Sequence, residues 1–258
     1  MLALKLILTP LLIGMASGAG RRWGPVVSGW LIGLPLTSAP VVLYLALEQG
    51  TAFAARVAQG TLMGGISQAA FCLTYSWLSF RVGWPGCWLT GWGVFFAATF
   101  VFAQVSFPLP LAFAGVVCFL LVVLLLWPRQ GGQAIETKAP AWEIPGRMVI
   151  ATGFVLGLTS AASVVGPRLS GLLSPLPIFA TVFAIFTHHL QGAAVARQVL
   201  HGVITSAFAC AAFFLVVAGL LERWGILATF SAALLAALLT QGCALWLASR
   251  YKSNPLRG

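Results

Sequence analysis

The chain has 258 residues, of which 60% are hydrophobic and only 7% are charged. Soluble domains typically contain about 25% charged residues, so this composition excludes an ordinary soluble protein and indicates a polytopic α-helical membrane protein. The net charge of +10 does not indicate nucleic-acid binding, because the basic residues are scattered between apolar segments instead of forming one patch. A transmembrane β-barrel is also excluded, since the apolar runs are continuous and do not alternate.

Nine membrane spans are predicted, because apolar segments approach or exceed the ~18–20 residues that cross a bilayer. They lie at residues 2–19, 24–47, 53–79, 84–105, 107–127, 148–165, 168–190, 194–221 and 225–249. The segment 128–147 is rich in proline, glycine and mixed charges, which predicts a polar linker. It separates a membrane repeat over 1–127, with five spans, from a second over 148–258, with four.

The two halves contain the same motif. Residues 24–35, GPVVSGWLIGLP, and 166–177, GPRLSGLLSPLP, share the pattern G-P-x-x-S-G-x-L-x-x-L-P at an offset of 142 residues. The same offset aligns Gly50 with Gly192 and Gly83 with Gly225. The first span, which resembles a secretory signal, aligns with the sixth and is therefore expected to be a retained helix.

Internal repeats are the usual construction of secondary transporters, whose sites lie at the repeat interface. Five spans before the second repeat would invert it, giving a five-plus-five architecture that lacks its last helix. If residues 84–127 crossed the membrane only once, the repeats would instead be parallel, four plus four.

Positive charge predicts the orientation of the nine spans, since cytoplasmic loops carry an excess of Lys and Arg. With the N-terminus outside, the cytoplasmic side contains Arg21, Arg22, Arg81, Arg129, Lys138, Arg147, Arg197, Arg250, Lys252 and Arg257. The outside then keeps Lys5, Arg56, Arg168 and Arg223.

Glycine and proline within spans two and seven predict broken helices. Freed backbone groups are costly in hydrocarbon unless protein, water or substrate satisfies them. Two such helices, brought together by the duplication, would line a polar cavity near mid-membrane. The candidate substrate-binding residues are Ser28, Pro35, Thr37, Ser38, Ser170, Ser174 and Pro177. The alternative is that these small residues only allow close helix packing.

A second polar set follows each repeated motif. Its members are Glu48, Gln49, Gln59, His188, His189, Gln191 and His201. An ionisable group at the membrane is a functional candidate, so Glu48 is a candidate for carrying a coupling proton, with the histidines as substitutes. Alternatively, the Gln-Gly pairs mark turns at the membrane interface.

These patterns favour a small secondary transporter of the bacterial inner membrane, which moves a small organic metabolite or organic anion by alternating access. The alternatives are an intramembrane enzyme acting on a lipid-linked substrate and a non-catalytic membrane subunit of a larger complex. The expected partners are a small-molecule substrate and membrane lipids, with assembly into a homo-oligomer left open. No cofactor or metal is expected, since neighbouring histidines on a helix point ~100° apart and the cysteines lack CxxC spacing.

Overall fold

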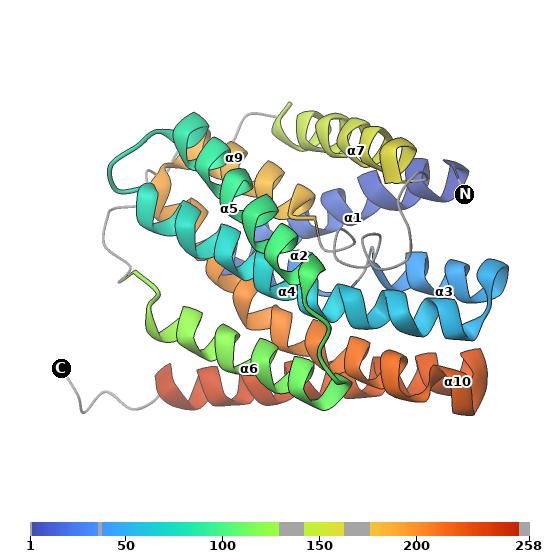
Figure 1. The fold of residues 1–258 in the computed structure, drawn as a ribbon. Coiled ribbons are helices and arrows are strands. Elements are labelled where there is room, and N and C mark those ends of the chain that lie inside the picture. Colours follow the sequence, from blue (N-terminus) through green and yellow to red (C-terminus); the bar gives the residue numbers. More distant parts are fainter. Residues whose placement is uncertain (1, 36–37, 129–141, 163–175, 253–258) are drawn as a thin grey trace.

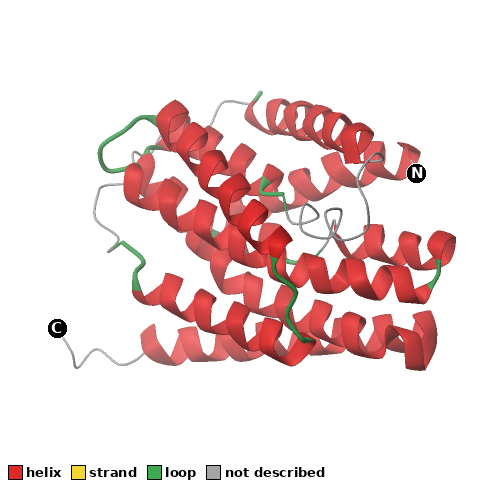
Figure 2. Ribbon diagram, viewed as in Figure 1, coloured by secondary structure: helices red, strands yellow, loops and turns green. Residues whose placement is uncertain are grey.

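The computed structural model describes residues 2–35, 38–128, 142–162 and 176–252. Within these ranges the protein consists of helices and contains no strand (Figure 2). The helices are α1 (Leu2–Trp23), α2 (Pro25–Gly33), α3 (Ser38–Gln49), α4 (Thr51–Leu78), α5 (Trp84–Gln104), α6 (Leu109–Leu125), α7 (Glu143–Ala162), α9 (Ile178–Gln191) and α10 (Ala193–Lys252). The helical fold class is confirmed, whereas the number of membrane spans and the repeat stay predictions.

The second predicted span, 24–47, is interrupted. The α2 helix ends at Gly33, Leu34 is extended with φ −67° and ψ 153°, and α3 begins at Ser38. Pro35 follows Leu34, and the residue before a proline is disfavoured in the α conformation. The break therefore falls where the Gly-x-Pro pattern predicts it.

Two glycines with the same backbone conformation separate neighbouring helices. Gly50, between α3 and α4, has φ 88° and ψ 163°, and Gly192, between α9 and α10, has φ 91° and ψ 165°. Positive φ is readily adopted only by glycine. The α3–α4 and α9–α10 junctions are therefore alike and 142 residues apart.

The α10 helix bends back at Gly225, where φ is 71° and ψ is −179°. The rings of Phe213 and Phe230, on either side of the bend, lie 5.9 Å apart. A straight helix would separate these residues by about 25 Å at 1.5 Å per residue. The helix therefore consists of two arms, residues 193–224 and 226–252, which Figure 1 shows as an orange and a red segment.

The first arm of α10 runs antiparallel to α4. Arg197, near the start of α10, donates a hydrogen bond to the Ser79 hydroxyl beyond the end of α4, at 3.0 Å. The indole nitrogen of Trp77 donates to the Leu126 carbonyl, at 3.0 Å, so α6 ends beside the end of α4. We call this side of the bundle the basic end. The helices α1, α4, α6 and α9 end there, and α7 and α10 begin there.

The opposite end contains the α3–α4 junction, the loop before α6 and the bend of α10. The α1 helix begins at one end of the bundle in Figure 1, and the second arm of α10 ends at the other.

Small residues bring α2 against the first arm of α10. A Cβ added to Gly29 would overlap the carbonyl oxygen of Val199, and one added to Gly202 would overlap that of Val26. Close backbone approach at paired glycines is the mode of packing expected between helices in membranes. It joins the first half of the chain to the second, beside the core that α1, α7 and α9 share.

Large apolar side chains cover the outside of the bundle. The most exposed include Leu89 and Phe100 on α5, Leu125 on α6 and Leu227 and Leu239 on α10. Such surfaces are unusual on soluble monomers. Two described helices are long and apolar enough to cross a membrane, residues 84–104 of α5 and 193–244 of α10.

Candidate functional site

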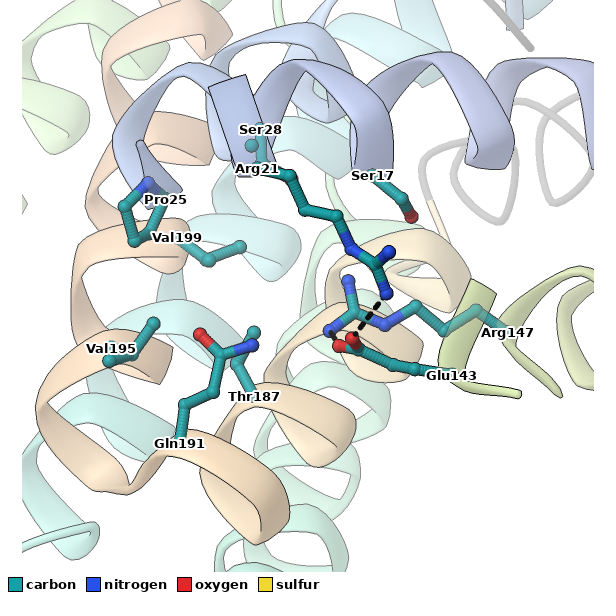
Figure 3. Close-up of a pocket in the computed structure, with 11 residues that line it drawn as sticks. Ser17, Arg21, Pro25, Ser28, Glu143, Arg147, Thr187, Gln191, Val195 and Val199 are labelled. Carbon is teal, nitrogen blue, oxygen red and sulfur yellow. Dashed lines mark hydrogen bonds and ion pairs between the residues drawn. The ribbon is translucent and has the colours of Figure 1, made fainter. Parts of the chain in front are cut away.

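A cavity of about 80 Å³ lies at the basic end, between helices from both halves of the chain. The end of α1 and the start of α2 form one wall, whereas the start of α7, the end of α9 and the start of α10 form the others (Figure 3). All of its lining residues fall within about two turns of a helix end. The cavity is therefore a vestibule at one end of the bundle.

Two arginines converge on one carboxylate beside this cavity. Glu143, the first residue of α7, accepts a hydrogen bond from Arg147 one turn later and another, at 3.1 Å, from Arg21 at the end of α1. Glu143 and Arg147 are buried, whereas the Arg21 side chain is 45% exposed and points toward Glu143 (Figure 3). The cluster carries a net charge of +1.

The Arg147 guanidinium also stacks on α9. Its central carbon lies 4.5 Å from the centre of the Phe183 ring and 5.5 Å from that of Phe186. Cation–π contacts of this kind stabilise a desolvated cation. They fix the guanidinium in place without using its hydrogen-bond donors.

Three buried polar atoms around the cavity have no hydrogen-bond partner among the described residues. They are the hydroxyl oxygens of Ser17 and Ser28 and the Nε of Arg147. Unsatisfied buried polar groups are rare in native proteins and indicate a functional role or a bound molecule. Three of them on α1, α2 and α7, around one cavity, make it the strongest candidate site in the described part of the chain.

The remaining walls mix polar and apolar groups. Thr187 donates its hydroxyl proton to the Phe183 carbonyl, at 2.6 Å, so its oxygen retains only acceptor capacity toward the cavity. Gln191 lies at the last turn of α9, and Val195 and Val199 supply an apolar face from α10. A small ligand would thus meet hydrogen-bond donors on one side and methyl groups on the other.

A second polar contact between the halves lies at the same end. The Tyr75 hydroxyl is 3.2 Å from Nδ1 of His188, which joins α4 to α9. Arg197, which donates a hydrogen bond to Ser79, also stacks on the Phe80 ring. The central carbon of its guanidinium lies 4.0 Å from the ring centroid. These contacts fasten α4 to the α9–α10 junction.

Two of the predicted residues meet at the cavity. Ser28 and Gln191 line it, although the expectation for Ser28 was a cavity near mid-membrane. Pro35 and Ser38 are buried around the break between α2 and α3, and Pro177 is buried before α9. Thr37, Ser170 and Ser174 lie outside the described residues.

The other polar residues are dispersed. Glu48 and Gln49 are exposed at the opposite end. Gln59 donates to the Phe107 carbonyl at 2.8 Å. His189 is exposed with its ring 6.3 Å from that of Trp84, and the His201 ring lies 5.5 Å from that of Trp127.

Sequence reasoning missed the charged part of the site. Residues 143–147 were expected in the linker, but they form the first turn of α7. The available signal was the spacing of Glu143 and Arg147, because an acid four residues before a base is a helical ion-pair pattern. The contact with Arg21, 122 residues away, had no local signal.

Comparison of the chain with family models, curated proteins and solved structures finds no match.

Proposed function

We propose that this protein is a secondary transporter of a small organic solute, working by alternating access in the bacterial inner membrane. The observation that carries the proposal is the polar cavity between the two halves, since α1 and α2 face α7, α9 and α10 across it. Transporters built from repeats bind their substrates at the repeat interface, next to broken helices. Here the interrupted α2–α3 segment supplies both Ser28 and the break.

Matching boundaries support an internal repeat. The offset of 142 residues relates the start of α4 to that of α10, and the end of α3 to that of α9. The same offset relates Gly83, which precedes α5, to Gly225, where α10 bends. The antiparallel course of α4 and the first arm of α10 is the relation that inverted repeats require.

The distribution of basic residues supports an orientation. Arg21, Arg22, Arg81, Arg147 and Arg197 lie at the basic end of the bundle, whereas Arg56 and Arg223 lie at the other. Under the positive-inside rule the basic end is cytoplasmic. The cavity would then face the cytoplasm.

Solute counterflow in proteoliposomes tests the proposal. Vesicles with the full chain are loaded with one unlabelled small metabolite at a time and diluted into a trace of the labelled compound, over a panel of carboxylates, amino acids and sugars. At least one compound is expected to accumulate transiently, and the Gly29→Leu variant, which separates α2 from α10, is expected to abolish this.

The matched control is Gly93→Leu, because Gly93 is exposed and a Cβ added there meets no neighbour within 4 Å. Flux no greater than in protein-free vesicles across the whole panel contradicts the transporter assignment.

A further inference from the structure

We propose that the cavity beside Glu143 binds a small planar oxyanion of single negative charge, of the size of acetate or nitrate. This deepens the proposed function, because it names the substrate class of the same site. It rests on the donors, charge and dimensions of the cavity.

The unpartnered groups select an acceptor. The Nε of Arg147 carries a hydrogen and has no lone pair, so only an acceptor can satisfy it. The Ser17 and Ser28 hydroxyls can both donate as well. A ligand that satisfies all three is rich in acceptor oxygens, as a carboxylate or nitrate is.

The charge of the cluster selects an anion. Glu143 neutralises only one of the two guanidinium groups that contact it. A monovalent anion would neutralise the other, and charge-assisted hydrogen bonds are about twice as strong as neutral ones. A cation would be repelled by the remaining positive charge.

The dimensions select a small ligand. An engineered protein cavity of about 150 Å³ holds benzene, whereas this one has about 80 Å³. An anion of the size of acetate or nitrate fits, and benzoate does not. The methyl groups of Val195 and Val199 suit the methyl group of acetate, so acetate is expected to bind at least as well as nitrate.

Thermal unfolding of the full chain in detergent provides the test. Sodium acetate, sodium nitrate or sodium benzoate is titrated while sodium gluconate holds the ionic strength constant. Ligand binding to the folded state raises the unfolding temperature in a saturable way. We expect saturable stabilisation by acetate and nitrate and none by benzoate.

Variants assign the effect to this cavity. Ser28→Ala is expected to raise the half-saturating acetate concentration by at least about 10-fold, the lower limit for the loss of one hydrogen bond to a charged group. Ser67→Ala is the matched control, since Ser67 is also buried and unpartnered but lies on α4 away from the cavity. Arg147→Gln is expected to abolish saturation, whereas Arg22→Gln, an exposed arginine next to Arg21, leaves it unchanged.

Glu143→Gln provides a second readout, because its expected effect on anion binding is opposite in sign to that of Arg147→Gln. It raises the charge of the cluster to +2, so the half-saturating acetate concentration is expected to fall at least several-fold. A cavity that holds water only would give no saturable shift in any variant, which overturns the proposal. A saturable shift that is equal in the wild type, Ser28→Ala and Arg147→Gln also overturns it, because the anion then binds elsewhere.

This test involves no membrane or flux, so its outcome is separate from that of the transport assay. Anion binding without flux would refute the transporter alone. Flux of another solute without anion binding would refute the anion site alone.

Discussion

The two ends of the bundle differ in whether their charged residues are buried. At the basic end Glu143, Arg147 and Arg197 are buried. Glu143 pairs with Arg21 of α1, Arg147 stacks on Phe183 of α9, and Arg197 donates to Ser79 beyond the end of α4. At the opposite end Glu48, Arg56, Glu222 and Arg223 are exposed. Burial of charge is expensive unless it is paired, so the basic end carries the structural signature of a site, and the opposite end that of an ordinary interface with solvent.

The contrast extends to positions that the 142-residue offset relates. Gln191 lines the cavity, whereas its counterpart Gln49 is exposed. Under the inverted-repeat proposal, equivalent residues lie at opposite ends, and a carrier in one conformation presents a cavity at only one of them. The asymmetry is therefore the expected appearance of one state of an alternating-access cycle.

Neutralising the buried acid should give the largest effect. Glu143→Gln leaves two guanidinium groups without their counter-ion, and we expect a loss of about 3–5 kcal/mol in the free energy of unfolding, the usual cost of breaking a buried ion pair. Glu222→Gln at the opposite end should change it by less than about 0.5 kcal/mol. Titration with a denaturing detergent measures the free energy of unfolding of both variants. Equal losses in the two variants would contradict the difference between the ends.

Crowding the contact between the halves should give the next largest effect. Gly29→Ala places a methyl group against the α10 backbone, and overpacking of this kind destabilises by about 1–3 kcal/mol. In Gly93→Ala the added Cβ meets open space within a helix, and the change should stabilise the protein by about 0.5–1 kcal/mol. The same titration compares the two variants. A similar loss of stability in both would show that close packing of α2 against α10 does not account for the effect at Gly29.

The bond between Tyr75 and His188 should contribute less. A double-mutant cycle with Tyr75→Phe and His188→Asn is expected to give a coupling energy of about 0.5–1.5 kcal/mol. The same cycle with His189→Asn, the exposed neighbour, should give a coupling near zero. Coupling of similar size in both cycles would mean that the hydrogen bond does not join α4 to α9.

The smallest effect is expected at Glu48. Because this carboxylate is exposed at the end of α3, Glu48→Gln should leave stability within about 0.5 kcal/mol of the wild type. Once a solute is identified, its concentrative transport should also be unchanged between pH 6 and 8. Loss of accumulation with intact counterflow would instead make Glu48 the coupling group.

Local patterns predicted much of the helical framework. Gly33 and Pro35 predicted the interruption of the second span, and Gly50 and Gly192 marked the junctions, because these residues limit what the backbone can do regardless of distant contacts. The cavity was only partly predictable. Ser28 and Gln191 belong to the repeated pattern, whereas the meeting of Arg21 with Glu143 depends on tertiary packing of α1 against α7, which no local rule encodes.

The inverted arrangement of the halves is the central claim, and two-sided thiol labelling tests it most directly. In a variant without Cys72, Cys87, Cys118, Cys210 and Cys243, Gln191→Cys and Gln49→Cys are introduced one at a time. A membrane-impermeant thiol reagent is then added to intact cells or to inverted membrane vesicles. The inverted arrangement predicts that Gln49→Cys reacts from outside the cell and Gln191→Cys only from the cytoplasmic side, whereas labelling of both from the same side would contradict it.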